Sequence, residues 1–268
     1  MLCLTYSSNF LLNLGQGKEE IFEDLGDFTV QIPKDYLVRS SEELIQKVFP
    51  RLGTDEMNTS DLINGAIYTP LNVDSQEINN LCLDKVHGAS RTYLSADSIL
   101  EQDHQEVVPP EFLNNISIGG MADHQLHLKV GCPVILLRNL QGGLRNGTRM
   151  IVISMMDRVL ECEVAVGAQK GKRVFLPRIP MHDRSDEFPF TIVRRQFPVR
   201  LAFCLTINKG QGQSNERVGL YLPSPVFAHG QLYTGFSRGK RTADVHVFIR
   251  DNEDGFTDNV VYPELLGG

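Results

Sequence analysis

The chain has 268 residues, of which 41% are apolar and 22% charged, a composition that excludes a wholly disordered protein and suffices for one or two domains with cores. The sequence contains no uninterrupted apolar run of about 18 residues and no N-terminal leader pattern, so we expect an intracellular protein without membrane spans. The five cysteines are scattered without a Cys-x-x-Cys pair, which favours reduced structural thiols over a disulfide framework or a zinc module.

The net charge of −7 hides a strong segregation of charge along the chain. Residues 1–135 contain 8 Lys and Arg against 20 Asp and Glu, whereas residues 136–250 contain 18 against 8. The middle of the chain therefore carries a cationic field, which favours a phosphate-binding surface. A solvated basic face without a ligand has the same signature in sequence, so charge alone leaves both interpretations open.

The first part of the chain predicts one βα unit of an α/β sheet. Residues 1–60 mix acidic runs with short apolar clusters and end in the polar stretch GTDEMNTSD, which is typical of a loop or linker. Ala66–Tyr68 predict a buried strand, after which Asn72 or Asp74 can cap a helix. The segment RTYLSADSI is expected to return as one further strand.

From about Leu126 the pattern changes to short β-rich runs separated by turn residues, which predicts a small antiparallel barrel. After this insertion, PVRLAFCLTI and RVGLYLP predict strands, VFAHGQLYTGF a helical segment and DVHVFIR a last strand. The expected fold class is therefore α/β, with an α/β domain interrupted by a small β-barrel.

Two motifs after the barrel carry groups suited to phosphate chemistry. Thr206–Gln213 (TINKGQGQ) follows an apolar strand directly, at the carboxyl end where open α/β sheets bind ligands. The second motif, GQLYTGFSR, ends in Arg238, whose planar and permanent charge suits a developing phosphoryl charge. Taken singly, the first motif also fits a tight surface turn, and the arginine also fits compensation of a helix dipole.

In order and spacing, these motifs resemble the last two helicase motifs of the PIF-type DNA helicases, including the transposon-borne Helitron-like branch. The segment LHLKVGCPVILLRNLQGGLRNGTRMIV is similar to the Src-homology-three-like barrel that this family inserts in its second RecA-like domain, and IYTPLNVDSQEIN is similar to the first motif of that domain. The resemblance covers roughly residues 10–250 and implies a partial P-loop NTPase fold. The implied domains are a remnant of the first RecA-like domain with a linker (1–63), the second RecA-like domain in two parts (64–125 and 196–250), the inserted barrel (126–195) and an acidic tail (251–268).

The resemblance implies an ATP-dependent 5′-3′ DNA helicase that acts in repair, recombination, telomere maintenance or transposition, and it implies a nuclear location. It also implies roles for individual residues. Arg238 corresponds to the arginine finger that reaches the terminal phosphate of ATP, with Gln231 in the same motif. The residues that correspond to contacts with single-stranded DNA and nucleotide are Thr206, Lys209, Gln211, Gly212, Thr69 and Asn72.

The chain departs from the family pattern at two places. The family usually has serine at the position of Gly210, and an alanine-leucine pair at the positions of Gly235 and Phe236. The first change removes a hydroxyl that can bind phosphate. The second places a flexible glycine in the helix that carries Arg238, which makes the helix less stable by about 1 kcal/mol than alanine would. Both departures point toward relaxed selection or a degraded copy.

The 268 residues contain no G-x-x-x-x-G-K-[ST] loop for ATP phosphates. We therefore expect ATP and Mg²⁺ to be cofactors of the complete helicase and neither to be held by this chain alone, with single-stranded DNA and the first RecA-like domain as partners. His124 and His127 are interpreted as structural, and no metal site is expected. Two alternatives stay open: a non-catalytic remnant that binds single-stranded DNA or a partner protein, and a product without a stable fold.

Overall fold

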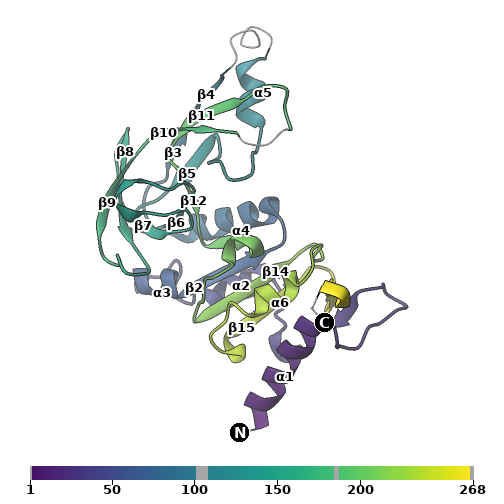
Figure 1. The fold of residues 1–268 in the computed structure, drawn as a ribbon. Coiled ribbons are helices and arrows are strands. Elements are labelled where there is room, and N and C mark those ends of the chain that lie inside the picture. Colours follow the sequence, from purple (N-terminus) through teal and green to yellow (C-terminus); the bar gives the residue numbers. More distant parts are fainter. Residues whose placement is uncertain (1, 101–107, 184–186, 266–268) are drawn as a thin grey trace. The chain divides into compact units, whose positions relative to one another are not determined.

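The computed structural model describes residues 2–100, 108–183 and 187–265 of the chain (Figure 1). It divides into two compact units, of which the first consists of Met1–Lys85 and Phe203–Gly268 and the second of Val86–Ala202. Within the described residues, no helix has the length and apolar character needed to cross a lipid bilayer.

A parallel four-stranded sheet forms the centre of the first unit. Its strands are adjacent in the order β13 (Cys204–Thr206), β2 (Gly65–Thr69), β14 (Arg217–Leu222) and β15 (Val245–Ile249). All residues of β2 are buried, as expected for a central strand of a parallel sheet that is covered on both faces. The strand predicted at Ala66–Tyr68 is confirmed as part of β2. The strands predicted at RVGLYLP and DVHVFIR are confirmed as β14 and β15.

Helices cover both faces of this sheet. A Cβ atom placed on Gly219 of β14 would lie 3.0 Å from Val48 of α2 (Ser41–Val48), whereas one placed on Gly235 of α6 (Gln231–Phe236) would lie 2.8 Å from Leu220. Because successive residues of a strand point to opposite faces, α2 and α6 lie on opposite sides of the sheet.

The third helix of the sheet, α4 (Asn72–Lys85), begins where the sequence predicts a helix after β2. Its Asn79 side chain ties it to β13, since Oδ1 accepts hydrogen bonds from the backbone N–H groups of Phe203 and Cys204 at 3.1 and 3.0 Å, and Nδ2 donates to the Cys204 carbonyl at 2.9 Å. A single buried amide thus fixes the helix against the start of the strand that leads to the Thr206 turn.

Capping side chains define the starts of two helices in the first unit. The Ser40 hydroxyl accepts the backbone N–H of Glu43 at 3.1 Å, and the Glu43 carboxylate accepts the N–H of Arg39 at 2.9 Å, which satisfies two donors at the start of α2. Asn58 caps α3 (Thr59–Asn64) by accepting from Asp61 N–H at 3.0 Å. The stretch GTDEMNTSD is therefore a loop only in part, because its last residues form this helix.

Both ends of the described chain pack into the first unit. Strand β1 (Thr29–Gln31) pairs antiparallel with β16 (Phe256–Asp258), and Phe10 of α1 (Leu2–Gln16) lies in an aromatic cluster with Tyr36 and Phe236. The N-terminal segment expected as a remnant of another domain and the segment expected as an acidic tail thus both contribute to the unit that holds the parallel sheet.

Short antiparallel strands build most of the second unit, which confirms the prediction of such strands from about Leu126 onward. The unit runs from Val86 to Ala202 and contains residues 126–195, the range expected for the insertion. Its described strands form sheets of two, three and five strands, in the order β3-β5, β10-β11-β4 and β12-β6-β7-β8-β9. The bounds of these elements are β3 (Arg91–Leu94), β4 (Ala96–Ile99), α5 (Pro110–Asn115), β5 (Gln125–Leu128), β6 (Pro133–Leu136), β7 (Arg149–Met155), β8 (Val159–Val164), β9 (Arg173–Pro177), β10 (Ile179–His182), β11 (Ile192–Gln196) and β12 (Val199–Leu201).

The expectation of one strand at RTYLSADSI is wrong, because the segment forms two strands in different sheets. Strand β3 pairs with β5, and β4 pairs with β11. Ser95 separates them, and its hydroxyl donates to Asp97 at 2.6 Å and lies 2.8 Å from His124 Nδ1. The segment PVRLAFCLTI is likewise two strands, with β12 in the second unit and β13 in the first.

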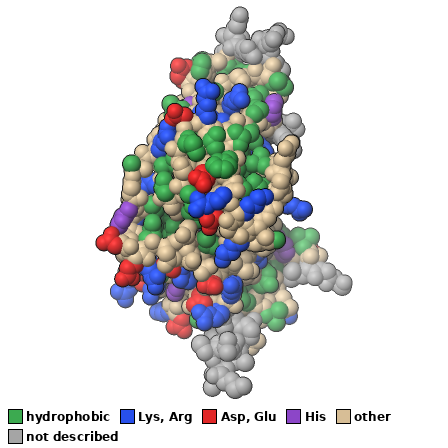
Figure 2. Space-filling model, turned by 90° about the vertical axis from the view of Figure 1, so that its left-hand side faces the viewer, with side chains coloured by type: hydrophobic (Ala, Val, Ile, Leu, Met, Phe, Trp, Pro, Cys, Tyr) green, Lys and Arg blue, Asp and Glu red, His purple; other side chains and the backbone are tan. Residues whose placement is uncertain are grey.

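Local ion pairs neutralise part of the basic middle segment. On neighbouring strands β8 and β9, Arg173 lies 3.1 Å from both Glu161 and Glu163. Arg200 of β12 lies 2.9 Å from Asp123, which precedes β5. On the face drawn in Figure 2, Lys and Arg side chains are exposed together with Asp and Glu side chains and hydrophobic ones. The charge segregation seen along the sequence therefore does not produce a continuous cationic surface on that face.

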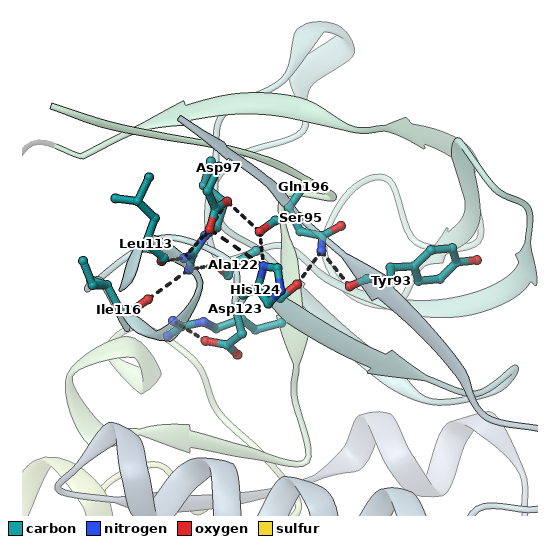
Figure 3. A network of polar contacts seen from close by, with 11 residues as sticks. Tyr93, Ser95, Asp97, Leu113, Ile116, Ala122, Asp123, His124 and Gln196 are labelled. Atoms are coloured by element: carbon teal, nitrogen blue, oxygen red, sulfur yellow. Dashed lines mark hydrogen bonds and ion pairs between the residues drawn. The ribbon is translucent and has the colours of Figure 1, made fainter. Parts of the chain in front are cut away.

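A buried guanidinium organises one end of the second unit (Figure 3). Arg194 on β11 is 1% exposed, and its Nε and Nη2 atoms donate to the Asp97 carboxylate of β4 at 2.8 to 3.1 Å. It also donates to the backbone carbonyls of Leu113, Ile116 and Ala122 at 2.7, 3.2 and 3.2 Å. One side chain thereby holds α5 and the loop after it against the three-stranded sheet.

Candidate functional site

The turn that follows β13 lies at the carboxyl edge of the parallel sheet. Thr206 ends the strand and is buried, and a short 3-10 helix, Ile207–Gly210, comes next. Lys209 is half-buried, whereas Gln211 and Gly212 are exposed. Gly212 has φ 77°, a left-handed conformation that favours glycine. The sequence-predicted loop is therefore presented to solvent at the edge where parallel sheets bind ligands.

Arg238 contacts this turn directly. Its Nη1 atom donates to the backbone carbonyls of Gly210 and Gln213 at 3.3 and 3.0 Å. Its Nε atom donates to the Thr234 carbonyl at 2.9 Å, and Nη2 donates to the Ser237 hydroxyl at 2.8 Å. The structure thus brings together the two motifs that the sequence singled out, although about 30 residues separate them in the chain.

These contacts leave the Arg238 guanidinium charged and only partly engaged. All four acceptors are neutral oxygens, so no carboxylate among them cancels the charge. An arginine side chain has five N–H donors, of which these bonds use four. A phosphate oxygen can therefore take the remaining Nη2 donor or replace the carbonyl contacts, and charge-assisted hydrogen bonds to phosphate are stronger than those to carbonyls.

Thr69 and Asn72 lie at the same edge of the sheet. Thr69 ends β2 and is paired in register with Thr206 at the end of β13, so the two threonines mark adjacent strand ends. Thr69 is fully buried, while Asn72, the first residue of α4, is exposed. Of the two residues, only Asn72 offers its side chain to solvent in the isolated unit.

Gln231 holds the turn that precedes α6. Its side chain is 3% exposed, and Oε1 accepts hydrogen bonds from the backbone N–H groups of Phe227 and Ala228 at 3.0 and 3.3 Å. Gly230 before it has φ 65° and is left-handed. The observed contacts of Gln231 are therefore with the backbone that leads into α6, the helix that ends two residues before Arg238.

A cluster that the sequence did not reveal joins α4, β14 and the residue that follows β15. The Tyr221 hydroxyl donates to Glu77 at 3.1 Å and accepts from Arg250 at 2.6 Å. Burial, together with the hydrogen bond to Glu77, raises the pKa of Tyr221 to about 12. Burial and, after it, the nearby Glu77 carboxylate also raise the pKa of Asp74, which is 8% exposed. These contacts join elements that are far apart in sequence, and no local motif marks them.

Asp74→Asn is expected to stabilise the first unit at pH 7. Since the folded pKa of Asp74 is raised, its contribution to stability is present below the unfolded value of about 3.9 and is lost as pH rises through the folded pKa. The substitution removes this cost at neutral pH, so the gain in melting temperature should be larger at pH 7 than at pH 3.5. Asp24→Asn, at an exposed position of the same unit, is the matched control, and an equal effect of pH on both variants contradicts the assignment.

The two histidines at the start of β5 bond to hydroxyl groups. Nδ1 of His127 lies 2.9 Å from the Thr92 hydroxyl, and Nδ1 of His124 lies 2.8 Å from that of Ser95. Cys132 is buried, and burial raises the pKa of its thiol to about 12. Within residues 2–100, 108–183 and 187–265, no group of three or more His, Cys, Asp or Glu side chains is arranged to hold a metal ion.

Comparisons with known proteins agree on one family. Residues 111–155 match the family model described as DNA helicase Pif1, 2B domain. The ATP-dependent DNA helicase PIF1 of Mus musculus is 31% identical over 150 residues, which are 53% of this chain and 22% of that protein. The Pif1 helicase of Campylobacter jejuni is 21% identical over 215 residues, 77% of this chain and 47% of that protein. The chain thus spans less than half the length of these curated relatives.

Solved structures show the same fold. The Pif1 helicase from Candida albicans has a TM-score of 0.61 at 19% identity, covering 98% of this chain and 56% of that one. The Bacteroides Pif1 helicase in complex with ADP-AlF3 and ssDNA has a TM-score of 0.59 at 22% identity, covering 97% of this chain and 51% of that one. The parallel sheet with its flanking helices and edge turn has the RecA-like α/β helicase fold. In sequence the chain is therefore similar to the PIF-type helicases, and in fold it resembles their solved structures.

Proposed function

We propose that this chain supplies the second RecA-like domain of an ATP-dependent 5′-3′ DNA helicase, with the strands of 126–195 forming a small Src-homology-three-like barrel inserted in it. The observation that carries the proposal is the contact between Arg238 and the Thr206–Gln213 turn at the carboxyl edge of the parallel sheet. This contact links a guanidinium that can bind the phosphate of a nucleotide to a polar loop that can bind a nucleic acid. Through it, the state of the nucleotide can affect the contact with the nucleic acid.

On the DNA side, the turn presents groups that suit a phosphate backbone. Lys209 contributes charge, and the exposed Gln211 and Gly212 offer an amide and an unobstructed backbone. Asn72 lies at the start of α4 after β2, which neighbours β13. These groups recognise phosphate and sugar rather than base edges, so we expect binding with little preference for sequence.

On the nucleotide side, Arg238 acts on an ATP molecule whose phosphates another RecA-like domain cradles. ATP with Mg²⁺ supplies the phosphoryl group that is transferred to water, and this chain contributes the guanidinium that stabilises the developing charge. Gln231 positions the turn before α6, and through that helix it positions Arg238.

Binding to labelled single-stranded oligonucleotides tests the DNA side of the proposal. The full chain should bind with a salt dependence, and Lys209→Ala should weaken binding by about five- to tenfold and reduce the slope of log K against log salt by about 0.7. Lys34→Ala, at an exposed lysine of the same unit, should leave both quantities unchanged. Binding that is independent of salt, or equal effects of the two substitutions, contradicts the proposed DNA contact.

ATP turnover tests the nucleotide side. The purified chain should show no DNA-stimulated hydrolysis, because its 268 residues contain no phosphate-cradling loop. Hydrolysis well above a blank that is lost with Arg238→Ala contradicts the assignment of ATP binding to another domain.

A further inference from the structure

A buried tyrosine lies behind the turn that Arg238 contacts. Tyr68 of β2 is fully buried, and its hydroxyl donates a hydrogen bond to Asn215 Oδ1 at 2.7 Å. Asn215 is itself 4% exposed and precedes β14. An uncompensated polar group at this depth is costly, so the two side chains fix each other's position.

Asn215 also holds the backbone on both sides of Gly239. Its N–H donates to the Arg238 carbonyl at 2.8 Å, and its carbonyl accepts from the Lys240 N–H at 3.0 Å, which forms a parallel bridge to Gly239. A continuous chain of hydrogen bonds therefore runs from the Tyr68 hydroxyl through Asn215 to the main chain of Arg238.

Tyr68 reaches Arg238 by a second route, through packing. A Cβ atom placed on Gly210 would lie 2.3 Å from Cε1 and 2.8 Å from Cδ1 of the Tyr68 ring. The Gly210 carbonyl is one of the two backbone oxygens that accept from Arg238 Nη1. The tyrosine ring thus lies against the segment that receives the guanidinium, while its hydroxyl supports the segment that carries it.

We propose that Tyr68 is a positioning residue for Arg238, acting through Asn215, and that the lack of a side chain at Gly210 leaves the space that the tyrosine ring occupies. The consequence for ATP hydrolysis rests on the proposed function, whereas the positioning itself is a property of this chain.

The backbone at Gly210 supports this interpretation. Gly212 has φ 77°, but Gly210 is not among the glycines with positive φ. A side chain at position 210 is therefore compatible with the backbone, and the obstacle is the Tyr68 ring. At position 212 the situation is reversed, since no atom lies within 4 Å of an added Cβ and the conformation alone favours glycine.

The hydrogen-bond route is tested with Tyr68→Phe, which keeps the ring and removes the hydroxyl. We expect exchange of the Arg238 Nε proton and of the Lys240 amide proton, measured by NMR on the full chain, to accelerate about fivefold or more. Tyr221→Phe is the matched control, because it removes another bonded hydroxyl from a buried tyrosine of the same unit without touching Asn215 or Arg238. If Tyr68→Phe changes these two signals no more than Tyr221→Phe does, the positioning role is overturned.

The packing route is tested with Gly210→Ser alone and combined with Tyr68→Leu. The single substitution should lower the melting temperature, and the double variant should regain most of the loss because leucine vacates the ring's space. The double variant should nevertheless keep the fast Arg238 exchange of Tyr68→Phe, since leucine cannot bond to Asn215. If Gly210→Ser causes no loss, or if Tyr68→Leu restores neither stability nor expression of a folded chain, the Tyr68 ring does not need the space at Gly210.

The two proposals fail in different ways. Accelerated Arg238 exchange in Tyr68→Phe, together with no salt-dependent DNA binding by the unaltered chain, supports the positioning and contradicts the proposed function. Salt-dependent DNA binding with unchanged Arg238 exchange supports the proposed function and overturns the positioning.

Discussion

Replacing Arg194 by methionine is expected to lower the free energy of unfolding of the Val86–Ala202 unit by about 3–5 kcal/mol, the cost of breaking a buried ion pair from one side. Both side chains of the Arg194–Asp97 pair are 1% exposed, so the carboxylate left behind has no access to water. Three backbone carbonyls, those of Leu113, Ile116 and Ala122, lose their donor as well.

Hydrogen exchange followed by mass spectrometry measures the loss of stability in the Val86–Ala202 unit itself. A thermal melt of the whole chain does not separate the two units. Amides of β4 and β11 should lose protection in Arg194→Met. Arg195→Met is the matched control, because the next residue of the same strand is exposed and its substitution should cost less than about 0.5 kcal/mol. Equal losses of protection in the two variants contradict a structural role for the buried pair.

A double substitution separates charge from packing at this site. Arg194→Met combined with Asp97→Leu leaves no uncompensated carboxylate, so part of the lost stability should return. The carbonyls that Arg194 bonded remain without their donor, so the recovery should be incomplete. A double variant less stable than Arg194→Met indicates that the cost lies in shape rather than charge.

Strands β2, β14 and β15 and helix α4 could be predicted because their signals are local. Apolar runs such as Ala66–Tyr68, followed by a polar turn and a helix, predict the βα unit without knowledge of any other segment. The sequence could not show that RTYLSADSI divides between two sheets, because its partners, β5 and β11, lie far along the chain. Nor could it show that residues near both ends pair as β1 and β16, since three-residue strands carry almost no periodic signal.

The candidate site divides in the same way. Arg238 and the Thr206 turn carry side chains with an evident chemistry, so the sequence singled them out. Gly210 and Gln213 contact Arg238 through carbonyl oxygens, which every residue type has, and Tyr68 reads as an ordinary residue of a buried strand. The surroundings of the glycines at positions 210 and 235 also could not be predicted from the sequence. Gly210 lies against Tyr68, and Gly235 lets α6 approach Leu220 closely.

In a protein that joins this chain to a RecA-like domain with a phosphate-binding loop, Arg238→Ala is expected to lower DNA-stimulated ATP hydrolysis by about a thousandfold, or about 4 kcal/mol of transition-state stabilisation. Lys240→Ala removes a nearby positive charge that is exposed and weakly paired with Glu216 at 3.5 Å, so it is the control for a general loss of charge. Arg238→Lys should recover little of the activity, because an ammonium group lacks the planar fork that reaches the turn and a phosphate together.

Binding of single-stranded DNA separates the two ways in which Arg238→Ala can act. The guanidinium holds the carbonyls of Gly210 and Gln213, so its loss can loosen the turn that presents Lys209. If the lost activity comes from the missing charge at the nucleotide, DNA affinity should fall less than about threefold, because the bonds to neutral carbonyls contribute modestly. If affinity and hydrolysis fall by the same factor, Arg238 acts through the turn, and the role of an arginine finger is contradicted.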